Sequence, residues 1–211
     1  MFNDVKFAGK VVCFVAVLAL MGCGAGGMKV TLKQDNYKPG FKSGEFSRYR
    51  GKTVILDNFI NQAANTRSWG YSSADQKVSY EATEHLESYM WYCFKKAFDF
   101  TGMKVLDASY GYQNPYYYHP WWGPRPYQQP AAAAPRGVSD FQMVLKSMTD
   151  QEWVVQVLVF KEGETKLQKD FTVTVPPTAS QDKAELEARA YRTVDQLVTT
   201  VFRDREFQRA F

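Results

Sequence analysis

Residues 79–102, SYEATEHLESYMWYCFKKAFDFTG, carry the pattern that decides the fold. Apolar side chains recur in this stretch at the helical period, which predicts a long amphipathic helix. The side chains on its apolar face are Ala82, Leu86, Met90, Cys93, Ala97 and Phe100. We expect the helix to span residues 79–101, with Ser79 as its N-cap and Gly102 as a left-handed C-cap.

Extended segments flank this helix on both sides. Residues 53–60, TVILDNFI, form a β-branched and mostly apolar run of strand length, and residues 103–110 resume an extended pattern. A strand, a long helix and a second strand make a crossover unit. We therefore expect the two strands to be parallel.

Three more strands and a second long helix follow. The strands are predicted at residues 141–146, 153–160 and 166–175, with Glu162-Gly163-Glu164 as the hairpin turn between the last two. A helix that begins at Ser180 has its apolar stripe at Leu186, Ala190, Val194, Leu197 and Val201. The order β-α-β-β-β-α predicts an α+β fold, a single mixed sheet of about five strands with two long helices on one face.

Composition and charge exclude several classes of protein. The chain has 211 residues, 45% of them hydrophobic, and a formal net charge of +4, which is typical of a globular domain. These values argue against a disordered chain and against a polybasic arm that binds nucleic acid. Three cysteines and two histidines are too few for a disulfide framework or a rich metal site, so we expect no metal and no cofactor.

The first 23 residues have the pattern of a secretory signal peptide. Lys6 and Lys10 precede an apolar run over residues 11–20, which is about half the length of a spanning helix. The run closes with Leu20-Met21-Gly22-Cys23, which resembles the lipobox of bacterial lipoproteins. This resemblance implies cleavage before Cys23, diacylglycerol on its sulfur and acylation, for example with palmitate, of its new amino terminus. The chain would then be a membrane lipoprotein.

Lipidation divides the chain into a signal peptide over residues 1–22, a lipid-anchored tether over residues 23–51 and an α+β domain over residues 52–211. Within the tether, a short strand near residues 29–32 is left open. By resemblance to the sorting rule of enteric bacteria, Gly24 implies the outer membrane, with the domain facing the periplasm. Once Cys13 leaves with the signal peptide and Cys23 carries lipid, Cys93 is alone. We expect it to be a buried thiol.

Residues 110–137, YGYQNPYYYHPWWGPRPYQQPAAAAPRG, form a loop rich in aromatic residues and proline after the second predicted strand. Three interpretations remain open: rings folded back over the sheet edge, a protein-docking surface, or rings that stack on sugars or sit at the lipid interface. The candidate binding residues are Tyr116, Tyr117, Tyr118, Trp121, Trp122, Arg125 and Tyr127.

Catalytic groups are not gathered in any motif. His85 has Glu81 one helical turn before it, which is typical of an exposed pair, and His119 lies in the aromatic loop without a nearby acidic residue. Asp57, at the end of the first strand, is a candidate site residue but is better interpreted as a turn carboxylate at the edge of the sheet. The sequence contains no nucleophile elbow, zinc-protease motif or phosphate loop, so we expect a protein that is not an enzyme.

The stretch Gly51-Lys52-Thr53-Val54-Ile55-Leu56-Asp57-Asn58-Phe59, followed by the long helix and Gly102, resembles the first strand and helix of a group of bacterial envelope lipoproteins. The group includes the curli-secretion channel subunit, the activators of peptidoglycan synthases and small lipoproteins of polysaccharide export. The resemblance implies an accessory, assembly or transport-scaffold component of the cell envelope that binds a protein partner, and it is compatible with a homo-oligomer. A glycan-binding envelope lipoprotein is the alternative.

Overall fold

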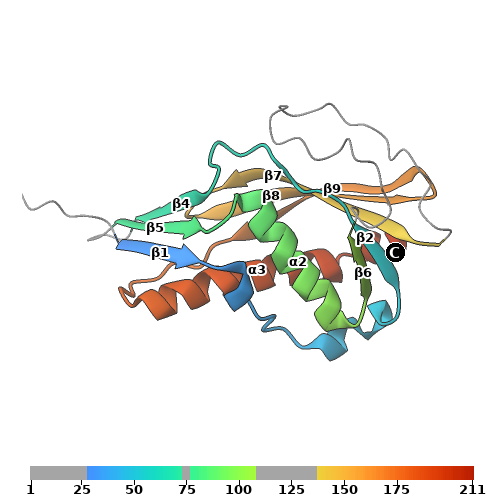
Figure 1. Cartoon of the computed structure of the whole chain (residues 1–211), viewed down its shortest axis with the longest axis horizontal. Helices are drawn as coiled ribbons and strands as arrows, with labels where there is room; N and C mark the ends of the chain where they lie inside the picture. Colours follow the sequence, from blue (N-terminus) through green and yellow to red (C-terminus); the bar gives the residue numbers. More distant parts are fainter. Residues whose placement is uncertain (1–27, 73–76, 108–136) are drawn as a thin grey trace, which may run out of the picture.

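The computed structural model describes residues 28–72, 77–107 and 137–211, and these ranges form an α+β fold (Figure 1). Within them the strands form two mixed sheets. The strands are β1 (Met28–Leu32), β2 (Thr53–Leu56), β3 (Ile60–Asn61), β4 (Ser68–Ser72), β5 (Lys77–Ala82), β6 (Lys104–Asp107), β7 (Ser139–Met148), β8 (Glu152–Lys161) and β9 (Glu164–Thr174). The helices are η1 (Gln34–Asn36), η2 (Ser43–Tyr49), α2 (Leu86–Thr101), α3 (Lys183–Arg203) and α4 (Arg205–Ala210).

The larger sheet has the strand order β6-β2-β7-β8-β9, and β3 also pairs with β7. Strands β2 and β6 are parallel, with Thr53 opposite Lys104, as expected for two strands joined through a helix. Strands β7, β8 and β9 form an antiparallel meander. Glu162 and Gly163 both have positive φ in the β8–β9 turn, which is the geometry of a tight hairpin and confirms the predicted turn.

A second sheet corrects the predicted single sheet. It has the order β1-β5-β4, with β5 parallel to β1 and antiparallel to β4. Strand β5 includes Ser79, which we expected to cap a helix. Val78, Tyr80 and Ala82 point into the core, while Ser79 is exposed, so residues 78–82 follow the two-residue period of a strand.

Helix α2 consequently begins at Leu86, with His85 as its N-cap, rather than at residue 79. Its C-terminus confirms the prediction, because Gly102 adopts the left-handed conformation and its backbone N–H donates to the carbonyls of Phe98 and Asp99. Helix α3 begins at Lys183, and the side chain of Asp182, not Ser180, accepts the hydrogen bond from the N–H of Ala184 at 2.7 Å.

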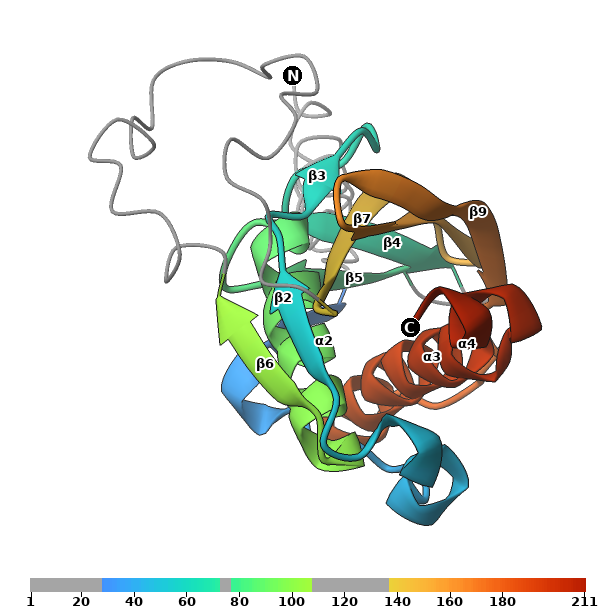
Figure 2. The ribbon, with the colours of Figure 1, turned by 90° about the vertical axis from the view of Figure 1, so that its right-hand side faces the viewer.

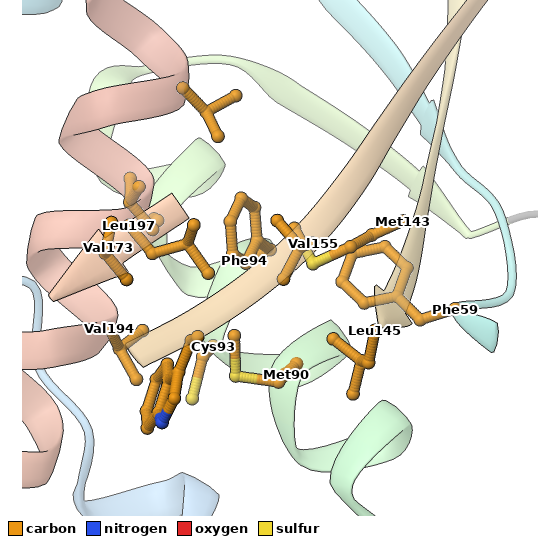
Figure 3. Packing of buried hydrophobic residues seen from close by; sticks show 14 of the residues in the cluster. Phe59, Met90, Cys93, Phe94, Met143, Leu145, Val155, Val173, Val194 and Leu197 are labelled. Atoms are coloured by element: carbon orange, nitrogen blue, oxygen red, sulfur yellow. The ribbon is translucent and has the colours of Figure 1, made fainter. Parts of the chain in front are cut away.

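The two main helices pack on the concave face of the larger sheet, as Figure 2 shows. Phe94 of α2 stacks on Phe141 of β7 with ring centroids 5.6 Å apart, and Phe98 meets Phe141 edge-on at 5.1 Å. Figure 3 shows Met90, Cys93 and Phe94 of α2 meeting side chains of the sheet and of α3. Offset-stacked and edge-on rings of this kind add stability beyond the area they bury.

Residues 28–51 do not form the expected tether. Val30 and Leu32 of β1 are buried, and so are Tyr37, Phe46 and Tyr49 in the segment that follows. The glycines and polar residues of this segment suggested a flexible chain, but the aromatic residues between them provide enough apolar surface to hold the segment on the domain. Within the described residues, the fold therefore includes β1 from Met28 onward and the segment that follows it.

Candidate functional site

The predicted binding residues lie outside the described part of the chain. Cys23 precedes Met28, and the aromatic loop falls between Asp107 and Gly137. The loop residues concerned are Tyr116, Tyr117, Tyr118, Trp121, Trp122, Arg125 and Tyr127. The structure does describe the two strands that carry this loop and the surface between them.

Both ends of the aromatic loop are attached to the larger sheet. Strand β6 ends at Asp107, opposite Leu56 of β2, and β7 begins at Ser139, opposite Val54 of β2. Strand β2 thus lies between the two strands that the loop connects. Because β6 and β7 are both parallel to β2, the chain must return from the carboxyl end of β6 to the amino end of β7.

The larger sheet has an outer face that points away from the helices (Figure 2). Phe141, Met143 and Leu145 of β7 face the core, so the side chains between them point outward. Val144 and Leu158 are buried on this outer face without belonging to the core cluster. Most of the other outward-facing side chains are polar, among them Gln142, Gln156 and Asp170, and none of the described helices packs on this face.

Two carboxylates lie on the same face, where β2 is interrupted by a bulge. The predicted continuous strand 53–60 is split at residues 57–59, and β2 and β3 pair with β7 on either side of this bulge. Asp57 accepts a hydrogen bond from the N–H of Asn58 at 2.7 Å and lies 3.4 Å from the side-chain amide of Gln142. Asp57 therefore does not lie in a turn at the edge of the sheet, as the sequence suggested, because β2 is an inner strand between β6 and β7.

Burial changes the acidity of these carboxylates. Loss of solvent raises the pKa of Asp140 to about 6, and the neighbouring charge of Asp57 contributes in the same direction. Burial also raises the pKa of Asp57, although the hydrogen bond from Asn58 opposes that shift. The Oδ1 atom of Asp140 is buried and has no hydrogen-bond partner within the described ranges. Each of these carboxyl groups therefore keeps its proton to a higher pH than an exposed aspartate does.

A hollow of about 390 Å³ lies where the aromatic loop rejoins the fold. Its lining residues are Gly51, Lys52, Thr53, Gly137, Val138, Ser139 and Phe211. The ammonium group of Lys52 donates to the carbonyl of Phe211 at 3.1 Å across this hollow. The C-terminal part of the chain and the start of β7 therefore meet at one end of the molecule.

The structure gives the surroundings of His85 and Cys93, the two other side chains whose chemistry the sequence raised. His85 is exposed and lies 3.3 Å from Glu87, not beside Glu81, which pairs with Lys29. No cluster of three or more metal-ligating side chains occurs in the described ranges. Cys93 is a free, buried thiol, as expected, and burial raises its pKa well above the usual value.

Hydrogen bonds that were not predicted from the sequence attach the N-terminal segment to the helices. We call residues 33–50 the N-terminal strap. The ammonium group of Lys96 donates to the backbone carbonyls of Gln34, Asp35 and Tyr37 at 2.7, 2.9 and 3.2 Å. A charged donor shared among three carbonyls holds this part of the strap on α2.

Asp195 of α3 holds the next part of the strap. One of its carboxylate oxygens accepts from the hydroxyl of Tyr37 at 2.7 Å, and the other accepts from the N–H of Gly40 at 3.0 Å. A Cβ atom on Gly40 would lie 2.8 Å from that second oxygen, which explains the glycine. The aromatic residues at 37, 41, 46 and 49, in an otherwise polar stretch, were the sequence signal of this fastening.

No protein-family model matches this chain, and no curated protein matches it. Among solved structures, it is similar to a protein from Xanthomonas campestris described by the family model DUF330. That likeness has a TM-score of 0.45 and 8% identity, and it covers 82% of this chain and 87% of the other. At this TM-score the likeness carries no functional assignment. In the described ranges, no helix has both the length and the apolar character needed to cross a bilayer.

Proposed function

We propose that this protein is a lipid-anchored component of the bacterial cell envelope that acts by binding a protein partner through its aromatic loop. The lipobox that ends at Cys23 supports the anchor, and the outer membrane, with the domain in the periplasm, is the proposed location. The observation that carries the binding role is the outer face of the larger sheet. Both strands that carry the aromatic loop belong to this sheet, and the helices leave that face uncovered.

Connection rules favour the outer face for the loop. Crossovers between parallel strands are right-handed in nearly all proteins. The crossover from β2 to β6 runs through α2 on the core face, and the connection from β6 to β7 runs back across β2 in the opposite direction. Two right-handed crossovers in opposite directions use opposite faces of a sheet. We therefore propose that the aromatic loop lies on the side of the sheet opposite α2 and α3, where it can meet a partner.

The residue types of the loop suit binding rather than catalysis. Tyrosine, tryptophan and arginine contribute most of the binding energy in protein interfaces, because large rigid rings bury area at little entropic cost. The loop holds Trp121, Trp122 and Arg125 within five residues. A non-enzymatic accessory, assembly or transport-scaffold role follows from this composition, with no cofactor.

Site-specific crosslinking in intact cells tests the binding role. A photoreactive amino acid at Trp121 should give one discrete crosslinked band, while the same group at exposed Lys166 on β9 should give none. With the photoreactive group at Tyr127 instead, replacing residues 116–122 with a glycine and serine linker should abolish the band without changing the melting temperature. Loss of folding in that variant would show that the loop is part of the core and would contradict the proposal.

Glycan binding is the alternative, because stacking on sugar rings also uses adjacent tryptophans. Of the five tryptophans, Trp69 and Trp153 are buried at 4% and 1% exposure, so their fluorescence should not respond to an added polysaccharide. A saturable change on titration with cell-wall polysaccharide, lost when Trp121 and Trp122 become phenylalanine and kept in a Trp91→Phe control, would favour a glycan. No change would leave the protein partner as the ligand.

A further inference from the structure

We propose that the N-terminal strap fixes the orientation of the lipid-anchored protein on the membrane. The end of the molecule where α3 begins faces the membrane, and the end where α3 finishes faces away from it. This inference rests on the proposed lipidation of Cys23. It adds a specific surface for the bilayer and a fixed direction for the rest of the fold.

The first step is the short distance between the proposed lipid and the fold. Only residues 24–27 separate Cys23 from Met28, the first residue of β1. Five steps along an extended chain span at most about 18 Å. The beginning of β1 therefore lies within about 18 Å of a lipid-bearing residue at the membrane surface. A free tether through residue 51 would allow a mean span of roughly 30 Å and any orientation.

The second step is the path of the strap along α3. The hydroxyl of Tyr191 donates to the carbonyl of Lys33 at 2.9 Å, and Asp195 accepts from Tyr37 at 2.7 Å. About two turns further along α3, the hydroxyl of Tyr49 donates to the carbonyl of Phe202 at 2.8 Å. The strap thus runs in the same direction as α3, from Tyr191 near the middle of the helix to Phe202 near its end (Figure 1).

The position of Met28 along the axis of α3 follows from the length of β1. Strand β1 packs against α3 and its five residues span about 17 Å before the strap begins. That length corresponds to roughly 11 residues of helix, counted back from Tyr191. This count reaches residue 180, just before α3 begins at Lys183, and Figure 1 shows that β1 starts at the same end of the molecule as α3. The anchor and the amino end of α3 are at the same end of the molecule.

The opposite end of α3 then points into the periplasm. Helix α3 has 21 residues and is about 30 Å long. Its distal end carries α4 and the hollow lined by Lys52, Gly137 and Phe211. Gly137 is where the aromatic loop rejoins the sheet. In this orientation, the C-terminal end of the proposed binding loop lies at the end of the molecule that faces away from the bilayer.

Fluorescence quenching on vesicles tests the orientation. Lys183 and Arg205 are both exposed and belong to helices at the two ends of this axis, and native Cys93 is buried and does not compete for label. Lipidated Lys183→Cys and Arg205→Cys variants would carry one fluorophore each, on vesicles of phosphatidylethanolamine and phosphatidylglycerol with a headgroup quencher. We expect quenching at least threefold stronger at position 183, and equal quenching would overturn the proposal.

Two controls separate this inference from the proposed lipidation. A linker of about 20 glycine and serine residues between Gly27 and Met28 should keep the protein on the vesicles but remove the difference between the two labels. A Cys23→Ser variant should not bind the vesicles. If the parent protein carries no acyl chain by mass spectrometry, the proposed anchor fails. If it is acylated and both labels respond alike, only the orientation fails.

Discussion

Two single residues, one at a turn and one on the outer face of the sheet, affect the free energy of unfolding in ways that can be measured. Gly102 and Asp140 are the clearest cases, one through its backbone and the other through its charge. The conformation of Gly102 followed from the sequence, because the apolar period of the helix stops at that position. The environment of Asp140 did not, because it depends on β2, which is about 85 residues away in the chain.

Gly102→Ala should destabilise the protein by about 1–2 kcal/mol. Gly102 has a φ of +85°, and an added Cβ would lie 3.2 Å from the side chain of Arg50. Gly44→Ala is the matched control, since a Cβ there meets nothing within 4 Å and its φ is not positive. Urea denaturation of both variants checks this. If Gly102→Ala lowers the free energy of unfolding by no more than Gly44→Ala does, the left-handed cap is contradicted.

Asp140→Asn should stabilise the protein at pH 7.5 by about 1 kcal/mol, because Asp140 is half-buried and solvent screens part of the effect. Its pKa of about 6 in the folded state exceeds the value of 3.8 in the unfolded chain. The folded state binds the proton more tightly, so the parent loses stability as the pH rises from about 4 to about 7. Thermal melts should show the advantage of the variant at pH 7.5 and its disappearance by pH 4, with exposed Asp35→Asn as the control.

At the scale of elements, the strand-helix-strand unit, the three-stranded meander and the last long helix were predictable from the sequence. Their periodicities are long and uninterrupted, and a regular period survives most tertiary contexts. The start of α2 and the smaller sheet were not predictable. The alternation in β5 spans only residues 77–82 and merges into the helical pattern, and its meaning depends on β1, which is about 50 residues away.

The strap was missed for a similar reason. Its residues have no regular period, and its stability comes from Lys96 and Asp195, two side chains on distant helices. Of the candidate site, the sequence indicated the aromatic loop but could not indicate the sheet face beneath it or the hollow at Gly137. Those features arise only when β2, β6 and β7 pair.

Lys96→Met should loosen the strap while the domain remains folded. The variant loses three hydrogen bonds from a charged donor, a loss of about 1–2 kcal/mol at a partly exposed site. We expect the amides of Asn36 and Tyr37 to exchange with solvent roughly tenfold faster. Lys95→Met serves as the control, because Lys95 pairs with Asp99 on the surface. Equal exchange in both variants would show that Lys96 does not hold the strap.

At the scale of the whole molecule, one core joins both sheets, the strap and the helices. Cys93 lies at 0% exposure within it. In the lipidated mature chain this thiol should be the only free one and should react with an aromatic disulfide reagent only when the entire domain opens. We expect no reaction over an hour in buffer and one equivalent in 8 M urea. Rapid reaction in buffer would mean that α2 separates from the sheet on its own.

The pairing of the strap with α3 also dictates an order of events during synthesis. Tyr37 and Asp195 are 158 residues apart. The strap is therefore synthesised long before α3, the helix on which it packs. Until then the rings of Tyr37, Phe46 and Tyr49 have no cover from α3. A chain truncated before α3 would leave those rings exposed close to its anchor. A quality-control protease can then recognise them.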